Sequence, residues 1–363
     1  MTNLGILIRL RHGKAALVAL MAVLAFVLAT AGVAEARRHG GGHKRHHMVF
    51  RHSSHHHVRH AGVRRGRHHV ASLRSGGGVE NEPPPSSVAA IVVDANSGRV
   101  LFSKGENELR HPASVTKVMT LYLLFEQLEK GKLRLDSPLM VSSHAAAQAP
   151  SKLGLAPGET ISVENAIKAV VTKSANDIAV AVAENIGGDE DSFAQMMTDK
   201  AHALGMRRTH FANASGLPNS EQITTAHDLA VLGRAIQDRF PHYYRYFSTH
   251  VFAYGGAQHR NHNHLLGRIE GVDGIKTGYT RASGFNLLTS VRRGGHHIVA
   301  VVLGGRTAGA RDHYMASLIE QHVAGGATTR TARAVTEETV HVRVSEHTGC
   351  NRNVTSAITP SVP

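Results

Sequence analysis

The sequence contains one cysteine, no tryptophan and few aromatic residues among its 363 positions. Because Cys350 stands alone, the chain can close no internal disulfide and cannot supply a thiolate metal site. The folded part must therefore be stabilised by the packing of aliphatic side chains rather than by covalent bridges. No metal ion or other cofactor is expected.

Acidic residues are absent from residues 37–74, a segment with about ten Lys and Arg and about eleven of the 28 histidines, interleaved with glycine. Most of the formal net charge of +14 lies there. The segment has too few apolar residues to offset chain entropy, so we expect it to be disordered. It fits a tether attracted to an anionic envelope, or a binder of transition metals. The lack of a fixed ligand spacing favours the tether.

The longest apolar run covers residues 15–33, follows three basic residues and ends at Ala34-Glu35-Ala36. This order is typical of an export signal, predicted here as residues 1–36 with cleavage after Ala36. The run is also close to the length that spans a bilayer, which leaves an uncleaved anchor open. Both interpretations place the protein in the periplasm or cell envelope, where nucleic acid is not an expected partner.

Turns and apolar patterns divide the remaining chain into a proline linker up to residue 87, a folded domain over 88–323 and a loose tail over 324–363. The elements expected in the domain are strands at 88–94, 99–103, 273–280, 286–292 and 297–303, helices at 113–130 and 308–322, and mostly helical structure over 136–237. Strands at both ends with helices between them predict an α/β or α+β fold, in which one sheet is covered by helices.

Ser114 and Lys117 are three positions apart near the start of the helix expected at 113–130. Residues at this spacing share a helix face, so the hydroxyl and the amine can meet in one pocket. Serine becomes a strong nucleophile when a base takes its proton, and lysine can be that base where burial or another cation keeps it neutral. Because Ser-x-x-Lys also arises by chance, the pair needs partners elsewhere in the chain.

Two later motifs supply such partners. In Ser174-Ala175-Asn176, the Ser174 hydroxyl can relay a proton between Lys117 and a leaving amine, and the Asn176 amide can hold a substrate peptide group. In the second motif, Lys276 is a further cation, which would lower the pKa of Lys117 and attract an anionic substrate.

The residues after Lys276 have matching chemistry. Thr277 can hydrogen-bond a carboxylate, and Gly278 lets a substrate backbone approach the strand edge. The main-chain N–H groups of Tyr279 and Ser114 could together form an oxyanion hole, worth several kcal/mol of transition-state stabilisation.

Ser114-x-x-Lys117, Ser174-x-Asn176 and Lys276-Thr277-Gly278 resemble, in order and spacing, the three motifs of the penicillin-binding proteins and serine β-lactamases. Over residues 88–322 the chain is most similar to the low-molecular-mass D-alanyl-D-alanine carboxypeptidases. The resemblance implies a β-lactamase/transpeptidase-like fold, with an antiparallel sheet flanked by helices and a helical subdomain. It also implies a serine peptidase that removes the terminal D-alanine from peptidoglycan stem pentapeptides and is acylated by β-lactam antibiotics.

The resemblance assigns a role to each motif residue. The implied nucleophile, base and proton relay are Ser114, Lys117 and Ser174. The implied substrate-binding residues are Asn176, Lys276, Thr277, Gly278, Tyr279 and Arg311. For the terminal carboxylate, Arg311 is preferred to Arg306. The segment Asn261-His262-Asn263 either lines the cleft or forms a hydrogen-bonded loop.

Three other functions stay open. An endopeptidase that cuts cross-links between stem peptides would use the same motifs. A class A β-lactamase needs a glutamate beyond the second motif to activate a water, whereas residues 207–219 contain no Asp or Glu. A wall-binding protein that has lost turnover would not be acylated by penicillin. Many carboxypeptidases of this group end in a β-rich domain with a membrane helix; the 324–363 tail is too short for one, and the basic segment is expected to replace it.

Overall fold

The computed structural model describes residues 84–337, which all belong to one unit of the chain, residues 71–363. The expected export signal, the tether as far as residue 83 and the tail beyond residue 337 lie outside the described residues. Within residues 84–337, no helix has the length and apolar character needed to cross a membrane.

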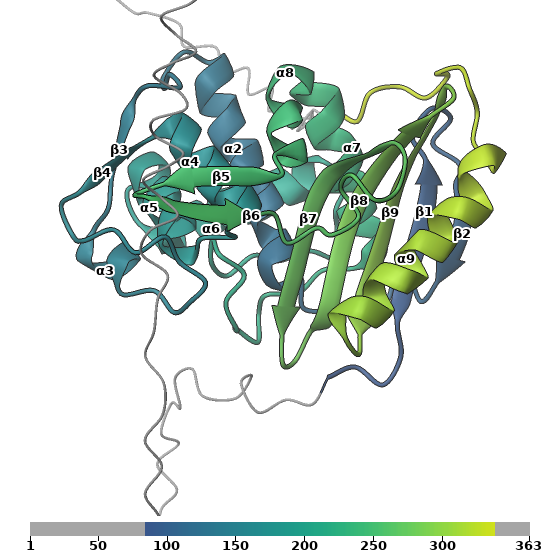
Figure 1. Cartoon of the computed structure of the whole chain (residues 1–363), viewed down its shortest axis with the longest axis horizontal. Coiled ribbons are helices and arrows are strands. Elements are labelled where there is room, and N and C mark those ends of the chain that lie inside the picture. Colours follow the sequence, from purple (N-terminus) through teal and green to yellow (C-terminus); the bar gives the residue numbers. More distant parts are fainter. Residues whose placement is uncertain (1–83, 338–363) are drawn as a thin grey trace, which may run out of the picture. The chain divides into compact units, whose positions relative to one another are not determined.

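Five antiparallel strands form the main sheet in the order β2-β1-β9-β8-β7 (Figure 1). The strands are β1 (Ala89–Asp94), β2 (Val100–Lys104), β7 (Val272–Thr280), β8 (Gly284–Arg293) and β9 (His296–Gly305). β1 pairs with β9, so the first strands of the domain join the last three in one sheet, as the sequence predicts. β7 forms one edge of the sheet and contacts the turn that carries Ser114.

The sheet has an apolar core on each face because successive side chains along a strand point to opposite sides. Ile91 belongs to the core shared with α7 (Ala226–Arg239), and Val92 to the core shared with α9 (Ala308–His322). Gly233 lets α7 approach closely, since a Cβ there would come within 2.9 Å of a leucine side chain of β8. The sheet is thus covered on both sides, with α9 across one face in Figure 1.

The regular structure between β2 and β7 is mainly helical and includes α7. The longer helices are α2 (Lys117–Glu129), α4 (Val163–Thr172), α5 (Asn176–Gly187) and α6 (Glu190–Ala203). The short elements are η2 (Ala113–Thr116), β3 (Pro138–Met140), α3 (Ser143–Ala146), β4 (Thr160–Ser162), α8 (Pro241–Tyr244), η3 (Arg245–Ser248), β5 (Val251–Tyr254), β6 (Ala257–Arg260) and, after α9, η4 (Val323–Gly325).

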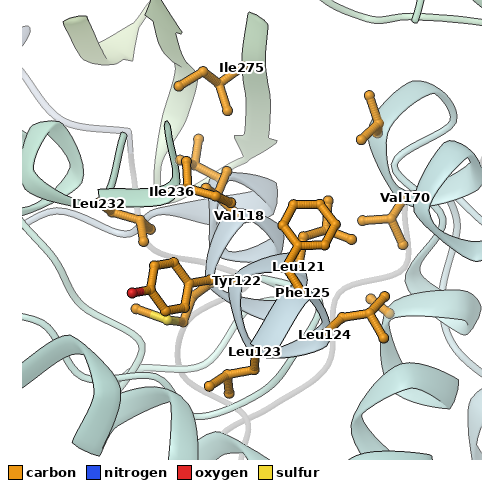
Figure 2. Packing of buried hydrophobic residues seen from close by; sticks show 14 of the residues in the cluster. Val118, Leu121, Tyr122, Leu123, Leu124, Phe125, Val170, Leu232, Ile236 and Ile275 are labelled. Carbon is orange, nitrogen blue, oxygen red and sulfur yellow. The ribbon is translucent and has the colours of Figure 1, made fainter. Parts of the chain in front are cut away.

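Helix α2 lies at the centre of this helical part. Figure 2 shows Leu121 and Phe125 of α2 in one cluster with Val170 of α4 and Ile236 of α7. Nearly every residue of α2 is buried, including its first residue, Lys117. A helix packed on all sides holds the residues at its start in fixed positions.

The structure differs from the sequence predictions in three ways. Ser114 lies in the 3-10 turn η2 that precedes α2, rather than in an α-helix that starts at residue 113. Two small two-stranded sheets, β3–β4 and β5–β6, were not predicted, because strands of three or four residues show too little alternation to be recognised.

A third difference concerns the tail, which was expected to be loose from residue 324. Residues 326–337, here called the terminal strap, are instead bonded to the domain. The Ala327 N–H donates to Asp94 Oδ2 at 2.9 Å, and the Val335 N–H donates to Asp238 Oδ2 at 2.9 Å. This part of the tail is therefore folded against the sheet and α7.

Candidate active site

The Ser114 hydroxyl lies at the junction of η2 and α2. Its Oγ is 3.0 Å from Nζ of Lys117, whose side chain is completely buried. The sequence predicted this contact from α-helical spacing. A 3-10 turn produces it equally well, because residues i and i+3 lie directly above one another in that helix.

Three oxygen atoms surround the Lys117 amine. In addition to Ser114 Oγ, they are Asn176 Oδ1 at 2.7 Å and the main-chain oxygen of Ser215. The Asn176 amide is oriented by its Nδ2, which donates to the Ala149 carbonyl at 2.8 Å. Neither of these two acceptors can donate, so a neutral amine satisfies them with its two N–H groups and presents its lone pair to the Ser114 hydroxyl. Proton transfer from Ser114 to Lys117 requires this arrangement.

The surroundings also disfavour the charged form of Lys117. Burial is the larger cause and the Lys276 charge is the second, and together they hold the pKa of Lys117 well below its usual value. Asp177 and Glu190 oppose this shift. The net effect favours the neutral amine that can accept a proton.

Ser174 lies between α4 and α5 in an unusual conformation. Its φ is +58°, a region that residues with a Cβ seldom adopt. Its hydroxyl is buried and has no hydrogen-bond partner among the described residues, although the residue lines the pocket. A buried hydroxyl without a partner destabilises the fold. The hydroxyl is therefore free to exchange protons with a bound molecule.

Two glycines allow other segments to approach Ser114 closely. At Gly216, whose φ is +81°, a Cβ would lie 2.0 Å from the Ala113 carbonyl oxygen. At Gly278 of β7, a Cβ would lie 2.9 Å from the Ser114 nitrogen. The main chain of β7 therefore passes directly beside the Ser114 N–H, where the sequence placed an oxyanion hole with Tyr279.

Two buried cations lie on the β7–β9 side of the site. Lys276 Nζ donates to the Thr277 carbonyl at 3.0 Å, and burial, followed by the Arg311 charge, lowers the pKa of Lys276 to about 7. Arg311 Nη1 donates to the Asn286 carbonyl at 2.9 Å, and its guanidinium pairs with Asp312 at 2.7 Å. These contacts fix the guanidinium and leave N–H groups available for a carboxylate.

Two histidines add to this side of the pocket. Burial is the main cause that lowers the pKa of His262 to about 4, so the imidazole is neutral at physiological pH. His264 also lines the pocket, with Nδ1 3.6 Å from Asp312 Oδ2. The neighbouring Asn263 donates to a β7 carbonyl at 2.9 Å. The 261–263 segment is thus both a hydrogen-bonded loop and part of the cleft.

A pocket of about 420 Å³ brings these groups together. Of the nine site residues that the sequence predicts, the two lysines are buried and do not line the pocket, and the other seven line it: Ser114, Ser174, Asn176, Thr277, Gly278, Tyr279 and Arg311. Within the described part of the chain, no Asp or Glu lines this pocket, and Arg306 does not line it either.

The sequence did not indicate every group at the site. The Ser215 carbonyl bonds to Lys117 through its main chain, so no side-chain pattern marks it. The turn residues Asn213 and Gly216 were the available signal, since such residues often mark a tight loop. Phe285 and Leu217 also line the pocket, although neither belongs to a motif that the sequence singled out as catalytic.

A serine hydroxyl beside a buried lysine amine, on an antiparallel sheet joined to a helical part, is the arrangement typical of serine hydrolases that work through an acyl-enzyme. Residues 79–307 match the family model described as D-alanyl-D-alanine carboxypeptidase. The chain therefore belongs to the D-alanyl-D-alanine carboxypeptidase family.

Individual relatives agree with this assignment. D-alanyl-D-alanine carboxypeptidase DacF of Bacillus subtilis is 33% identical over 236 residues, which are 64% of this chain and 60% of the relative. Penicillin binding protein 5 from Haemophilus influenzae has a TM-score of 0.63 and 28% identity, over 69% of this chain and 73% of that one. Penicillin-Binding Protein D2 from Listeria monocytogenes, in its ampicillin bound form, has a TM-score of 0.57 and 30% identity, over 64% and 95%.

Proposed function

We propose that this protein is a serine D-alanyl-D-alanine carboxypeptidase, which removes the terminal D-alanine from peptidoglycan stem pentapeptides through an acyl-enzyme on Ser114. The observation that carries the proposal is the buried Lys117 amine, 3.0 Å from Ser114 Oγ and bonded on its other sides to two acceptors. The family match supports the substrate class.

In the proposed acylation step, Ser114 Oγ attacks the carbonyl of the penultimate D-alanine while Lys117 takes the hydroxyl proton. The negative oxygen that forms is stabilised by the N–H groups of Ser114 and Tyr279. Ser174 relays the proton from Lys117 to the departing nitrogen, the C–N bond breaks and D-alanine leaves, so that Lys117 is neutral again. Water then attacks the acyl-enzyme with the same base, which releases the shortened peptide and restores Ser114.

Substrate recognition is proposed to depend on the cationic side of the pocket. The terminal carboxylate lies against Thr277, with the charges of Lys276 and Arg311 behind it. Asn176 Oδ1 accepts from Lys117 and its Nδ2 donates to the Ala149 carbonyl, so Asn176 holds the base. The second N–H of its Nδ2 is proposed to hold a substrate peptide group.

A β-lactamase function is less well supported. In class A β-lactamases a glutamate activates the water that deacylates the enzyme rapidly, and no carboxylate lines the described pocket. A β-lactam should therefore acylate Ser114 and remain attached. Ampicillin is bound in the Listeria structure, which supports the proposal that this site accepts β-lactams.

Benzylpenicillin tests the proposal. The purified protein is incubated with the drug, its intact mass is followed over hours, and any adduct is mapped by peptide digestion. We expect a lasting adduct on Ser114. This adduct should be absent in Ser114→Ala and nearly absent in Lys117→Ala. Release of D-alanine from a pentapeptide is then measured, with a cross-linked dimer as the second substrate to detect endopeptidase activity. Turnover in Ser114→Ala would disprove the mechanism.

The location of the protein is a separate proposal. The export signal predicted at 1–36 leads the protein to the periplasm or cell envelope, and the basic segment 37–74 holds it near an anionic surface. We expect the association of the intact protein with the envelope to weaken as salt is added and to be lost when residues 37–74 are deleted. Association that ignores both changes would contradict this role.

A further inference from the structure

We infer that Glu190 is a positioning residue for the catalytic lysine: its carboxylate holds the loop that supplies a main-chain acceptor to Lys117, and its charge acts on the amine. The inference rests on the proposed role of Lys117 as the base. Glu190 belongs to none of the three motifs and does not line the pocket.

The connection runs through one short loop. Glu190, the first residue of α6, accepts a hydrogen bond at Oε1 from the Ala214 N–H at 2.9 Å. The next residue, Ser215, offers the carbonyl to which Lys117 Nζ donates. The Ala214 carbonyl accepts from Thr120 Oγ1 of α2 at 2.7 Å. The loop is thus held between α6 and the helix that begins with Lys117.

Further bonds of this loop involve the uncharged side chains of Asn213 and Gln222. Asn213 Oδ1 accepts from the Gly216 N–H at 2.7 Å and from Gln222 Nε2 at 3.0 Å. Among the described bonds that hold residues 213–216, Glu190 therefore supplies the negative charge. It does so one residue away from the carbonyl that contacts the base.

The direction in which the Glu190 charge shifts the pKa of Lys117 follows from the groups around each of these side chains. The titratable groups that face Glu190 are His144 of α3, with Nε2 3.7 Å from Oε2, Glu184 of α5 and Asp191 of α6. Burial raises the pKa of Glu190, and the Ala214 N–H and His144 oppose that rise. When ionised, Glu190 raises the pKa of Lys117, against the lowering by burial and by Lys276.

This charge has two consequences for the reaction. When Lys117 takes the Ser114 proton it becomes a buried cation, and a nearby carboxylate stabilises that cation without lining the pocket. The same carboxylate keeps the resting pKa of Lys117 from falling so far that the amine becomes too weak a base. Glu190 would thus raise the pKa of Lys117 from outside the pocket, while Lys276 lowers it from the side where substrate is proposed to bind.

Glu190→Gln separates charge from geometry, since the amide oxygen can still accept from Ala214. The matched control is Glu184→Gln, which removes a carboxylate beside the same His144 but contacts no residue of the 213–216 loop. Titration of Lys117 is followed by NMR of protein with ¹³C-labelled lysine, and its signal is assigned by its loss in Lys117→Ala. Acylation by benzylpenicillin is measured over the same pH range.

Glu190→Gln should lower the titration midpoint of Lys117 by about half a unit to one unit and move the acid limb of acylation to lower pH by the same amount. The acylation rate on the plateau should fall about three- to tenfold. Glu190→Ala, which also leaves the Ala214 N–H unpaired, should acylate at least about tenfold more slowly again. Glu184→Gln should match the wild type in both titration and acylation.

Equal Lys117 midpoints in wild type and Glu190→Gln would overturn the inference, as would an equal shift in Glu184→Gln. The NMR readout does not depend on turnover. If the wild type is not acylated but the midpoint shifts, the proposed function fails and the electrostatic coupling stands. If the wild type is acylated and the midpoint is unmoved, the proposed function stands and the inference fails.

Discussion

Several residues at this site have a backbone conformation or a buried environment that lowers the stability of the fold. Ser174 combines a φ of +58° with a buried hydroxyl that has no partner among the described residues. Lys117 and Lys276 are amines buried almost completely. Strained and desolvated groups of this kind persist where a reaction uses them, so removing one should affect activity and stability in different directions.

Ser174→Ala tests this separation. Because the hydroxyl has no hydrogen bond to lose within residues 84–337, the free energy of unfolding should stay the same or rise slightly. Turnover should fall by about 10²–10⁴-fold, the usual contribution of a group that transfers protons. Thermal unfolding and D-alanine release measure the two effects.

Ser290→Ala in β8 is the matched control, because its buried hydroxyl donates to Gln237 Oε1 at 3.1 Å. It should lose about 1 kcal/mol of stability and keep its activity. A Ser174→Ala protein that is both destabilised and active would show that the hydroxyl has a structural role instead.

Lys276 gives the reaction a pH dependence with a definite sign. Its pKa is lowered to about 7, so it is a cation below that pH and neutral above it. Under the proposed mechanism, the attraction of a substrate carboxylate is therefore lost as pH rises, whereas Lys117 can no longer act as the base once it is protonated at low pH. kcat/KM should be bell-shaped, with its alkaline limb near pH 7.

Lys276→Arg keeps its charge throughout this range, so its alkaline limb should move upward by two pH units or more. The measurement is kcat/KM for a D-alanyl-D-alanine peptide from about pH 5 to 10. An unchanged alkaline limb in Lys276→Arg would assign that limb to another group.

At the scale of elements, the serine is positioned by close contacts between η2, the 213–216 loop and β7. Gly216→Ala would place a methyl group 2.0 Å from the Ala113 carbonyl oxygen at a φ of +81°. The turn must then move, so stability should fall by about 3 kcal/mol and acylation of Ser114 by about 10²-fold.

Gly158→Ala separates these effects from backbone strain alone. Gly158 has a similar φ of +86°, but nothing lies within 4 Å of an added Cβ. Its stability should fall by about 1 kcal/mol, with acylation unchanged. Denaturant unfolding and the rate of penicillin acylation measure both variants, and equal effects would show that the contact with Ala113 is unimportant.

The sequence predicted the long elements and the three motifs well, because both leave a periodic or spaced pattern of side chains. β7, β8, β9 and α9 were predicted to within a few residues. Prediction from the sequence failed where contacts involve the main chain. The position of η2 depends on glycines 216 and 278, which are distant in sequence, and the Ser215 carbonyl has no side-chain signal. Glu190 was missed for the same reason, since its partner is a peptide N–H.

At the scale of the whole described domain, the terminal strap (residues 326–337) joins parts that are far apart in the sequence. Near its start, Asn96 Nδ2, at the β1–β2 turn, donates to the Ala327 carbonyl at 2.7 Å. In its middle, Arg330 pairs with Asp238 of α7 at 2.7 Å. At its end, Glu337 pairs with Lys200 of α6. The strap has no periodic pattern of apolar side chains, so the sequence predicted a loose tail. Several of the bonds that hold it are made by its main chain, and such bonds leave no pattern in the sequence.

Two truncations test the strap. A chain that ends at residue 325 loses its bonds to Asp94, Asn96 and Asp238, whose polar groups are buried or partly buried, so stability should fall by about 2–4 kcal/mol. For a domain of this size, that loss lowers the Tm by roughly 5–15 °C. A chain that ends at residue 337 keeps all these bonds, so the difference between the two chains isolates the strap.

Because no strap residue lines the pocket, penicillin acylation at 25 °C should be the same in both. Equal Tm values would show that the strap follows the fold without stabilising it, and a loss of acylation in the folded shorter chain would show that it also acts on the site.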